Sequence, residues 1–119
     1  MSSSAQSGKP AEQMLSQAID RLWARFLPEI LQRIAALEEA AVAVAAENLT
    51  APRRKEAEAA AHKLAGVLGT FSLARGTALA RELEGTFSSE SSLVPGDGDR
   101  LTAIAAELRA MAEGRPSSS

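Results

Sequence analysis

The stretch Ala59-Ala-Ala-His-Lys-Leu-Ala-Gly-Val-Leu-Gly-Thr-Phe-Ser72 decides the fold, and it holds His62, the only histidine among 119 residues. With the residues just before it, the stretch is predicted to be helical, because its apolar residues recur at spacings of three and four. They form one stripe of Ala57, Ala60, Ala61, Leu64, Leu68 and Phe71. At about 100° per residue, His62 points roughly 140° away from that stripe. We therefore expect the imidazole on the solvent-facing side of a helix whose other side is buried.

The solvent-facing side around His62 is predicted to carry little bulk. The residues that share this side are Lys55, Glu58, Ala59, Gly66 and Gly69. A glycine inside a helix costs roughly 1 kcal/mol relative to alanine, so the two glycines need an explanation other than stability. Close approach of another molecule explains them. The surface is therefore a candidate docking face.

The run His62-Lys63-Leu64-Ala65-Gly66, followed by Gly69-Thr70-Phe71 and by residues 78–84, resembles the histidine-containing phosphotransfer (HPt) domain. The resemblance is dense from Ala57 to Glu84 and extends loosely over the helical pattern from Ala11 to Glu113. It implies an exposed helical histidine that carries a phosphoryl group between receiver aspartates of a multistep two-component relay. It also implies that Mg²⁺ belongs to the partner receiver domain, so no cofactor is expected in this chain.

Three positions depart from the commonest form of the family pattern. Ala65 stands where a lysine or arginine is frequent, whereas Lys63 follows the histidine directly, as in a subset of the family. Val67 and Ser72 stand where small residues or glycine are frequent. We expect Ala65 to lie on the docking face. We expect Lys63 to support the phosphate with its long side chain, and a merely solvated lysine is the alternative.

Composition and charge narrow the class of protein. A chain of 119 residues makes one domain, and 45% apolar residues with only 3% aromatic residues favour packed helices over a sheet. A net charge of −2 argues against nucleic acid as a partner, and no apolar run is long enough to cross a membrane. No cysteine is present, and one histidine alone makes a poor metal site. We expect a cytoplasmic domain without a bound metal.

Five helical segments are predicted between two disordered tails. Residues 1–9 and 114–119 are rich in Ser, Gly and Pro and lack an apolar period, which leaves residues 10–113 for the HPt bundle. The segments are 10–26, 28–47, 51–70, 73–87 and a last helix that follows a loop over 88–98. Pro28 is expected to bend or interrupt the chain between the first two segments. Thr50 with Pro52 is expected to start the third segment, and Asp97 or Asp99 to cap the last.

Short connections predict an all-α fold in which the last four segments form an up-and-down antiparallel four-helix bundle. The additional N-terminal helix, with Met14, Leu15, Ala18, Ile19, Leu22 and Phe26 on its apolar face, is expected to cover one end. Trp23 lies off this stripe, so it is expected to be partly exposed or at the junction of the first two segments.

Three cations, Arg53, Arg54 and Lys55, stand about two helical turns before His62. An ordinary solvated turn is the simplest interpretation. Cations in the first turn of a helix nevertheless interact unfavourably with the helix dipole. A functional use of these cations would compensate for that cost. The resemblance implies an acidic pocket on the receiver, and a basic rim here would steer that encounter.

The predicted function is that of a histidine phosphocarrier, not an enzyme. His62 Nε2 accepts a phosphoryl group from one receiver aspartate and passes it to another. The implied partners are response-regulator receiver domains and a hybrid histidine kinase, and the chain is expected to be a monomer. One alternative is an HPt-like interaction module without phosphotransfer. A weaker alternative is the dimerisation and phosphoacceptor segment of a sensor kinase, which usually has an acidic residue and a proline where Lys63 and Val67 stand here.

Overall fold

The computed structural model describes residues 2–88 and 92–115, with only the backbone described for residues 2–9. Its elements are four helices: α1 (Ser2–Ala45), α2 (Ala51–Thr70), α3 (Ala74–Phe87) and α4 (Asp97–Gly114). The prediction of an all-helical fold is confirmed for this part of the chain. No helix within the described ranges has the length and hydrophobicity needed to span a membrane.

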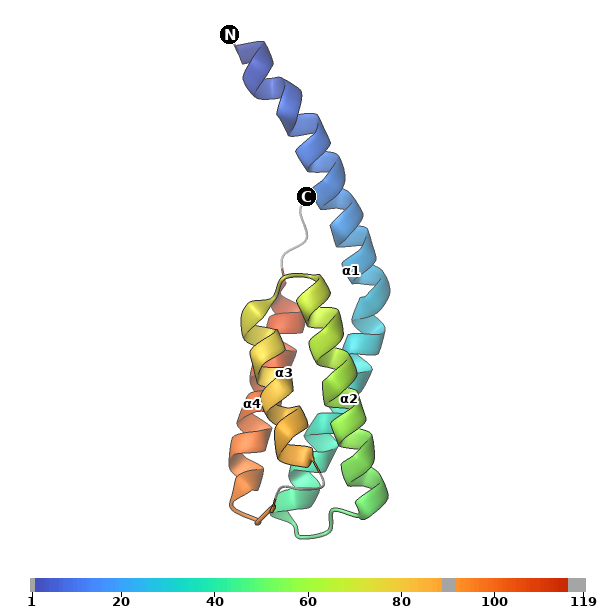
Figure 1. The fold of residues 1–119 in the computed structure, drawn as a ribbon, viewed down its shortest axis with the longest axis vertical. Coiled ribbons are helices and arrows are strands. Elements are labelled where there is room, and N and C mark those ends of the chain that lie inside the picture. Colours follow the sequence, from blue (N-terminus) through green and yellow to red (C-terminus); the bar gives the residue numbers. More distant parts are fainter. Residues whose placement is uncertain (1, 89–91, 116–119) are drawn as a thin grey trace.

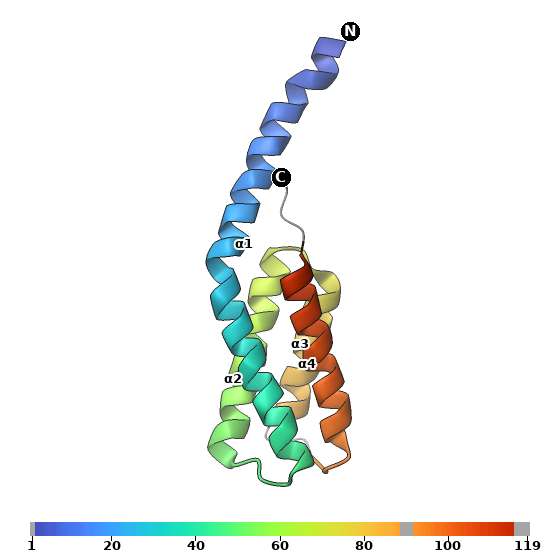
Figure 2. The same cartoon turned by 180° about the vertical axis from the view of Figure 1, so that it is seen from behind.

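The lower half of α1 packs with α2, α3 and α4 into one bundle, and its upper half extends beyond the bundle (Figure 1). Each helix contacts the next one along the chain, and α4 closes the ring by packing on α1. Figure 2 shows the α1–α4 pair from behind. The molecule measures 65 × 20 × 20 Å along its principal axes. The extension of α1 accounts for this elongated shape.

The two segments predicted on either side of Pro28 are one helix, because α1 continues through this residue. The predicted interruption at Pro28 and the separate N-terminal helix are therefore wrong. A proline inside a helix removes a backbone hydrogen bond and costs about 3 kcal/mol. Burial offsets this cost here, because Trp23, Ile30 and Ile34 on both sides of the proline belong to the same core.

Trp23 is only 5% exposed, so the first of its two predicted positions, partial exposure, is wrong. The second, the junction of the first two segments, lies inside α1 because both segments are one helix. A continuous α1 changes its position: residues 23, 27, 30, 34 and 37 recur at spacings of four and three and share the face toward the other helices. The Trp23 ring meets Phe71, at the end of α2, edge to face, with ring centroids 5.0 Å apart. Trp23 therefore anchors α1 at the upper end of the bundle.

Both ends of the described chain differ from the predicted tails. The backbone of α1 is helical from Ser2, since lengthening an existing helix adds hydrogen bonds without a new nucleation cost. Arg115 Nη1 lies 3.2 Å from Asp20 Oδ1, and the guanidinium lies 4.9 Å from the centre of the Trp23 ring. Arg115 therefore joins the end of α4 to α1. Met1 and residues 116–119 lie outside the described residues.

The helix starts follow local chemistry. Thr50 Oγ1 accepts a hydrogen bond of 3.2 Å from the Arg53 N–H, so the predicted start of α2 is confirmed. The N-cap of α4 is Gly96, without a side-chain cap, so the prediction that Asp97 or Asp99 caps this helix is wrong. Both carboxylates lie in the first turn instead, where negative charge complements the helix dipole. Residues 89–91 of the predicted loop lie outside the described chain.

The core consists of aliphatic side chains, many alanines, Trp23 and Phe87. Most core positions predicted from the periodicity of α2, α3 and α4 are buried, while Phe71 and Met111 are partly buried against the core. The apolar face of upper α1 is different: Met14, Leu15, Ile19 and Leu22 are exposed. The other described residues leave this face uncovered, because α1 continues outward instead of folding over the bundle.

The substitution Pro28→Ala tests the continuous helix. Pro28 is exposed, and alanine would supply the N–H that can bond to the Ala24 carbonyl. We expect the free energy of unfolding, measured by urea denaturation, to rise by about 1–2 kcal/mol. Pro52 is the matched control, because it lies in the first turn of α2, where a proline removes no intrahelical bond. Equal effects of Pro28→Ala and Pro52→Ala would contradict a helix through residue 28.

Candidate phosphoacceptor site

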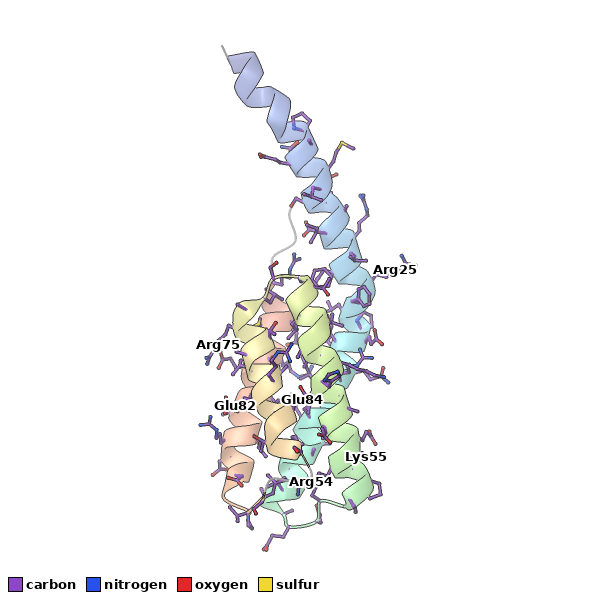
Figure 3. The ribbon with its side chains drawn as sticks, in the orientation of Figure 1. Arg25, Arg54, Lys55, Arg75, Glu82 and Glu84 are labelled. Atoms are coloured by element: carbon purple, nitrogen blue, oxygen red, sulfur yellow. The ribbon has the colours of Figure 1, made fainter. Side chains whose placement is uncertain are left out.

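His62 lies in the middle of α2 with its side chain 69% exposed. Its Nδ1 lies 2.7 Å from Oε2 of Glu84, whose side chain is 27% exposed. Figure 3 shows Glu84 on α3, on the side that faces α2. A carboxylate can only accept hydrogen bonds, so Nδ1 is the nitrogen that carries the proton in a neutral imidazole at this position, and Nε2 then keeps its lone pair. The pair therefore offers Nε2 of an exposed imidazole as a nucleophile.

Glu84 was not predicted to belong to the site, although it lies in the stretch that carries the family resemblance. The two residues are 22 positions apart, and only the packing of α2 on α3 joins them. Gly69 and Thr77 lie opposite each other near the turn between α2 and α3, because a Cβ on Gly69 would lie 3.8 Å from Thr77 Oγ1. His62 lies seven residues before Gly69, and Glu84 lies seven residues after Thr77, so both are about two helical turns away from that turn. This equal spacing from the turn is the feature of the sequence from which the pairing of Glu84 with His62 could have been predicted.

Most residues of the predicted docking face lie on the exposed side of α2. Lys55, Ala59, Gly66 and Gly69 are exposed, and Glu58 is partly exposed. Ala65 is only 1% exposed, so the prediction that it lies on the docking face is wrong. Three residues turn a helix by about 300°, which rotates Ala65 back from His62 toward the core.

The glycines leave the surface beside His62 open. A Cβ on Gly66 would meet nothing within 4 Å, and the one on Gly69 would make only an ordinary contact. Neither glycine has a positive φ. The fold therefore does not require glycine at either position. Beyond Gly69, a shallow and mostly apolar hollow lies between α2 and α3, bordered by Thr77, Ala78 and Arg81.

The three cations at the start of α2 have different surroundings. Arg54 Nε donates a hydrogen bond of 3.1 Å to the Phe87 carbonyl, and Nη2 donates to the Ser88 carbonyl. Figure 3 shows Arg54 at this end of α3. Arg54 therefore satisfies carbonyls at the C-terminal end of α3. Arg53 lies 3.8 Å from Glu39 on α1, and Lys55 is exposed on α2.

Lys63 is exposed and borders a groove between α1 and α2, together with Glu29 and Arg33. Arg33 donates a hydrogen bond of 2.7 Å to Glu29 and thereby lowers the pKa of that carboxyl. Lys63 adds a smaller electrostatic effect in the same direction. Lys63 thus lies near α1, whereas His62 pairs with α3. Within the described ranges, no three His, Asp or Glu side chains gather as metal ligands would.

Comparison with protein-family models matches residues 21–114 to the Hpt domain. The chain belongs to the HPt family. The resemblance predicted from the sequence is thereby confirmed, and with it a part in histidine phosphotransfer within two-component signalling. No match was found among curated proteins or among solved structures.

One departure from the HPt pattern has a local explanation. Ser72 ends α2 in the left-handed conformation, with φ of 58°, and its N–H bonds to the Gly69 carbonyl at 3.0 Å. Glycine adopts this conformation without steric cost, which is the physical reason for expecting glycine at this position. Serine adopts it at a modest cost, and Ser72 lies in the turn after α2, ten residues along the chain from His62.

The substitutions Gly66→Ala and Gly98→Ala compare a glycine at the HPt site with a glycine in the packing. Gly66 is helical and open, so alanine is expected to raise the free energy of unfolding by roughly 0.5–1 kcal/mol. A Cβ on Gly98 would lie 2.6 Å from Ala45 Cβ and 2.9 Å from its backbone Cα. Alanine there is expected to lower the same free energy by about 1–3 kcal/mol. Urea denaturation measures both, and a destabilised Gly66→Ala variant would refute the open surface.

Proposed function

We propose that this up-and-down antiparallel bundle is a phosphoryl carrier rather than an enzyme, with His62 as the phosphoacceptor. The observation that carries the proposal is the exposed imidazole whose Nδ1 faces Glu84, leaving Nε2 as the nucleophile. Membership of the HPt family supports the same assignment. Receiver domains and a hybrid histidine kinase are the proposed partners, in the cytoplasm.

In the first transfer, the lone pair of His62 Nε2 attacks the phosphorus of a receiver's aspartyl phosphate in line. The N–P bond forms as the bond from phosphorus to the aspartate oxygen breaks, and the receiver regains its carboxylate. In the second transfer, an aspartate oxygen of another receiver attacks the phosphorus, the O–P bond forms as the N–P bond breaks, and Nε2 regains its lone pair. Mg²⁺ is expected on the receiver, so this chain supplies the acceptor and its orientation.

Glu84 acts in this scheme as a positioning residue. Formation of the N–P bond places positive charge on the imidazole ring, while Nδ1 keeps its proton. The Glu84 carboxylate lies against that proton and stabilises the charge as it develops. It also holds the ring orientation, since the hydrogen bond joins His62 to a second helix.

The surface around His62 supports docking of a receiver. Gly66 and Ala59 present little bulk on either side of the histidine along α2, so a receiver can approach closely. Lys55 and Arg53 are exposed and are proposed to steer the acidic pocket of the receiver. Lys63 is proposed to support the phosphate. Arg54, committed to the end of α3, contributes mainly to the fold.

The decisive experiment compares wild type with His62→Gln. Each protein is incubated with a phosphorylated receiver, and acid-labile phosphate on the HPt chain is measured. We expect wild type to gain phosphate and His62→Gln to gain none. Because His62 is exposed, its replacement should change the free energy of unfolding by no more than about 0.5 kcal/mol. Phosphate on the variant would show another acceptor, and a wild type that no receiver phosphorylates would favour an interaction module.

Substitutions of Glu84 test the positioning role. Glu84→Ala removes the acceptor for Nδ1–H and is expected to slow transfer on the order of 10–100-fold. Glu84→Gln keeps a neutral acceptor and is expected to slow it less. Glu82→Gln is the matched control, because Glu82 is on the same helix and pairs with Arg100. Rapid-quench measurements give the rate of phosphoryl transfer for each variant. If the Glu84→Ala variant is phosphorylated as fast as the Glu82→Gln variant, Glu84 has no positioning role.

A further inference from the structure

The shallow hollow between α2 and α3, here called the α2–α3 hollow, begins two helical turns from His62. Gly69, Thr77, Ala78 and Arg81 border it, and Gly69 lies on the same face of α2 as the histidine. The Thr77 hydroxyl donates a hydrogen bond of 2.9 Å to a backbone carbonyl of its own chain, four residues earlier. The hollow therefore presents a mostly apolar surface to solvent, with one guanidinium at its edge.

That guanidinium, of Arg81, is exposed and has no ion-pair partner in the part of the chain that the structure describes. The two carboxylates of α3 have other partners, since Glu82 pairs with Arg100 and Glu84 with His62. Arg81 lies three residues before Glu84, or about 4.5 Å along the helix. A free cation therefore lies about one helical turn from the residue that contacts the histidine.

The groove on the other side of α2 has a different chemistry. It lies between α1 and α2, and charged side chains border it, among them Glu29, Arg33 and Lys63. Glu29 and Arg33 already form an ion pair of 2.7 Å. A protein that covered this groove would remove these charges from water, which costs free energy. Of the two surfaces that flank α2, the one toward α3 is therefore the easier to cover.

The size of protein–protein contacts places the α2–α3 hollow beneath any receiver that reaches His62. Transient complexes bury on the order of 500 Å² on each partner, which corresponds to a disc with a radius of roughly 13 Å. Gly69 lies seven residues from His62, or roughly 10 Å along α2. A contact of this size centred on the histidine therefore extends over the near edge of the hollow.

We propose that the α2–α3 hollow anchors the receiver domain, which places an apolar side chain beside Ala78 and a carboxylate against Arg81. This assignment rests on the proposed function, because it needs a receiver whose aspartate reaches His62. A few well-packed contacts carry most of the affinity of an interface, and exposed charges add rate and choice of partner. Arg81 is thus a specificity-determining residue, and the receiver lies over α2 and α3.

The substitution Ala78→Glu tests the hollow in the full chain. A panel of receiver domains in Mg²⁺ is screened by fluorescence anisotropy, and the tightest binder is used, whether or not it transfers phosphate. Glutamate places a charge in the apolar contact, so we expect the Kd to rise at least about tenfold. Ala78 is exposed and glutamate is a good helix former, so the fold should persist, as circular dichroism will show.

Gln32→Glu is the matched control for Ala78→Glu. Gln32 is exposed and borders the groove between α1 and α2, so this variant adds the same charge on the other side of α2. Its Kd is expected to stay within about twofold of wild type, because exposed single charges contribute little.

The substitution Arg81→Gln tests the cation at the edge of the hollow. We expect the Kd to rise about three- to tenfold at low salt, and the difference from wild type to shrink as salt rises. Arg75→Gln is the matched control, because Arg75 is exposed on the same helix and pairs with Glu107 of α4. Figure 3 shows Arg75 on the side of α3 away from α2. Equal Kd values for the two variants at low salt would contradict the role of Arg81.

Three further results would overturn the anchoring site. They are an Ala78→Glu variant that binds like wild type, a Gln32→Glu variant that loses as much affinity as Ala78→Glu, and a panel in which no receiver binds. Phosphate on His62 judges the proposed function separately. Binding that Ala78→Glu weakens, without transfer, would contradict the carrier and support the anchoring site. Transfer that Ala78→Glu leaves unchanged would contradict the anchoring site alone.

Discussion

The close packing of α2 on α3 is the contact on which the site depends. Small residues allow it: Ala65 and Ala80 are fully buried, and a Cβ on Gly76 would come within 3.0 Å of Leu68 Cδ1. Because the helices approach closely, a short carboxylate side chain from α3 reaches an imidazole on α2 at 2.7 Å. The proposed phosphoacceptor is thus oriented by a contact between two helices rather than by a loop.

The rest of the bundle holds this pair in place from its ends. At the upper end, Trp23 of α1 meets Phe71, which follows α2, and Arg115 lies over both rings. At the lower end, Arg54 of α2 donates hydrogen bonds to the last carbonyls of α3. The two helices that carry the site are therefore tied near both of their ends, and α1 and α4 complete the core between them.

Few groups make up the site because a carrier needs little chemistry of its own. The structure has an exposed imidazole on α2, a carboxylate on α3 for its Nδ1, and open space beside it at Gly66. The proposed receiver supplies the remaining groups, so the surface must admit another protein. The upper half of α1 extends beyond the bundle and does not cover α2 (Figure 1).

The sequence by itself determined the helices α2, α3 and α4, most of the core and the exposure of His62. These depend on apolar periodicity and on a local cap such as Thr50, and both are properties of neighbouring residues. The bounds of α2 and most of the residues on its exposed side could be read in this way. The family could also be recognised, because its pattern is concentrated around one histidine.

Only the tertiary structure decided the partner of His62, the burial of Ala65 and the path of α1 through Pro28. Periodicity shows which side of a helix is apolar, but it does not show which helix packs there or how closely. Glu84 and Ala65 depend on that distance. Pro28 is costly by every local rule, and the cost is offset by core contacts on both sides of it, which no local pattern contains.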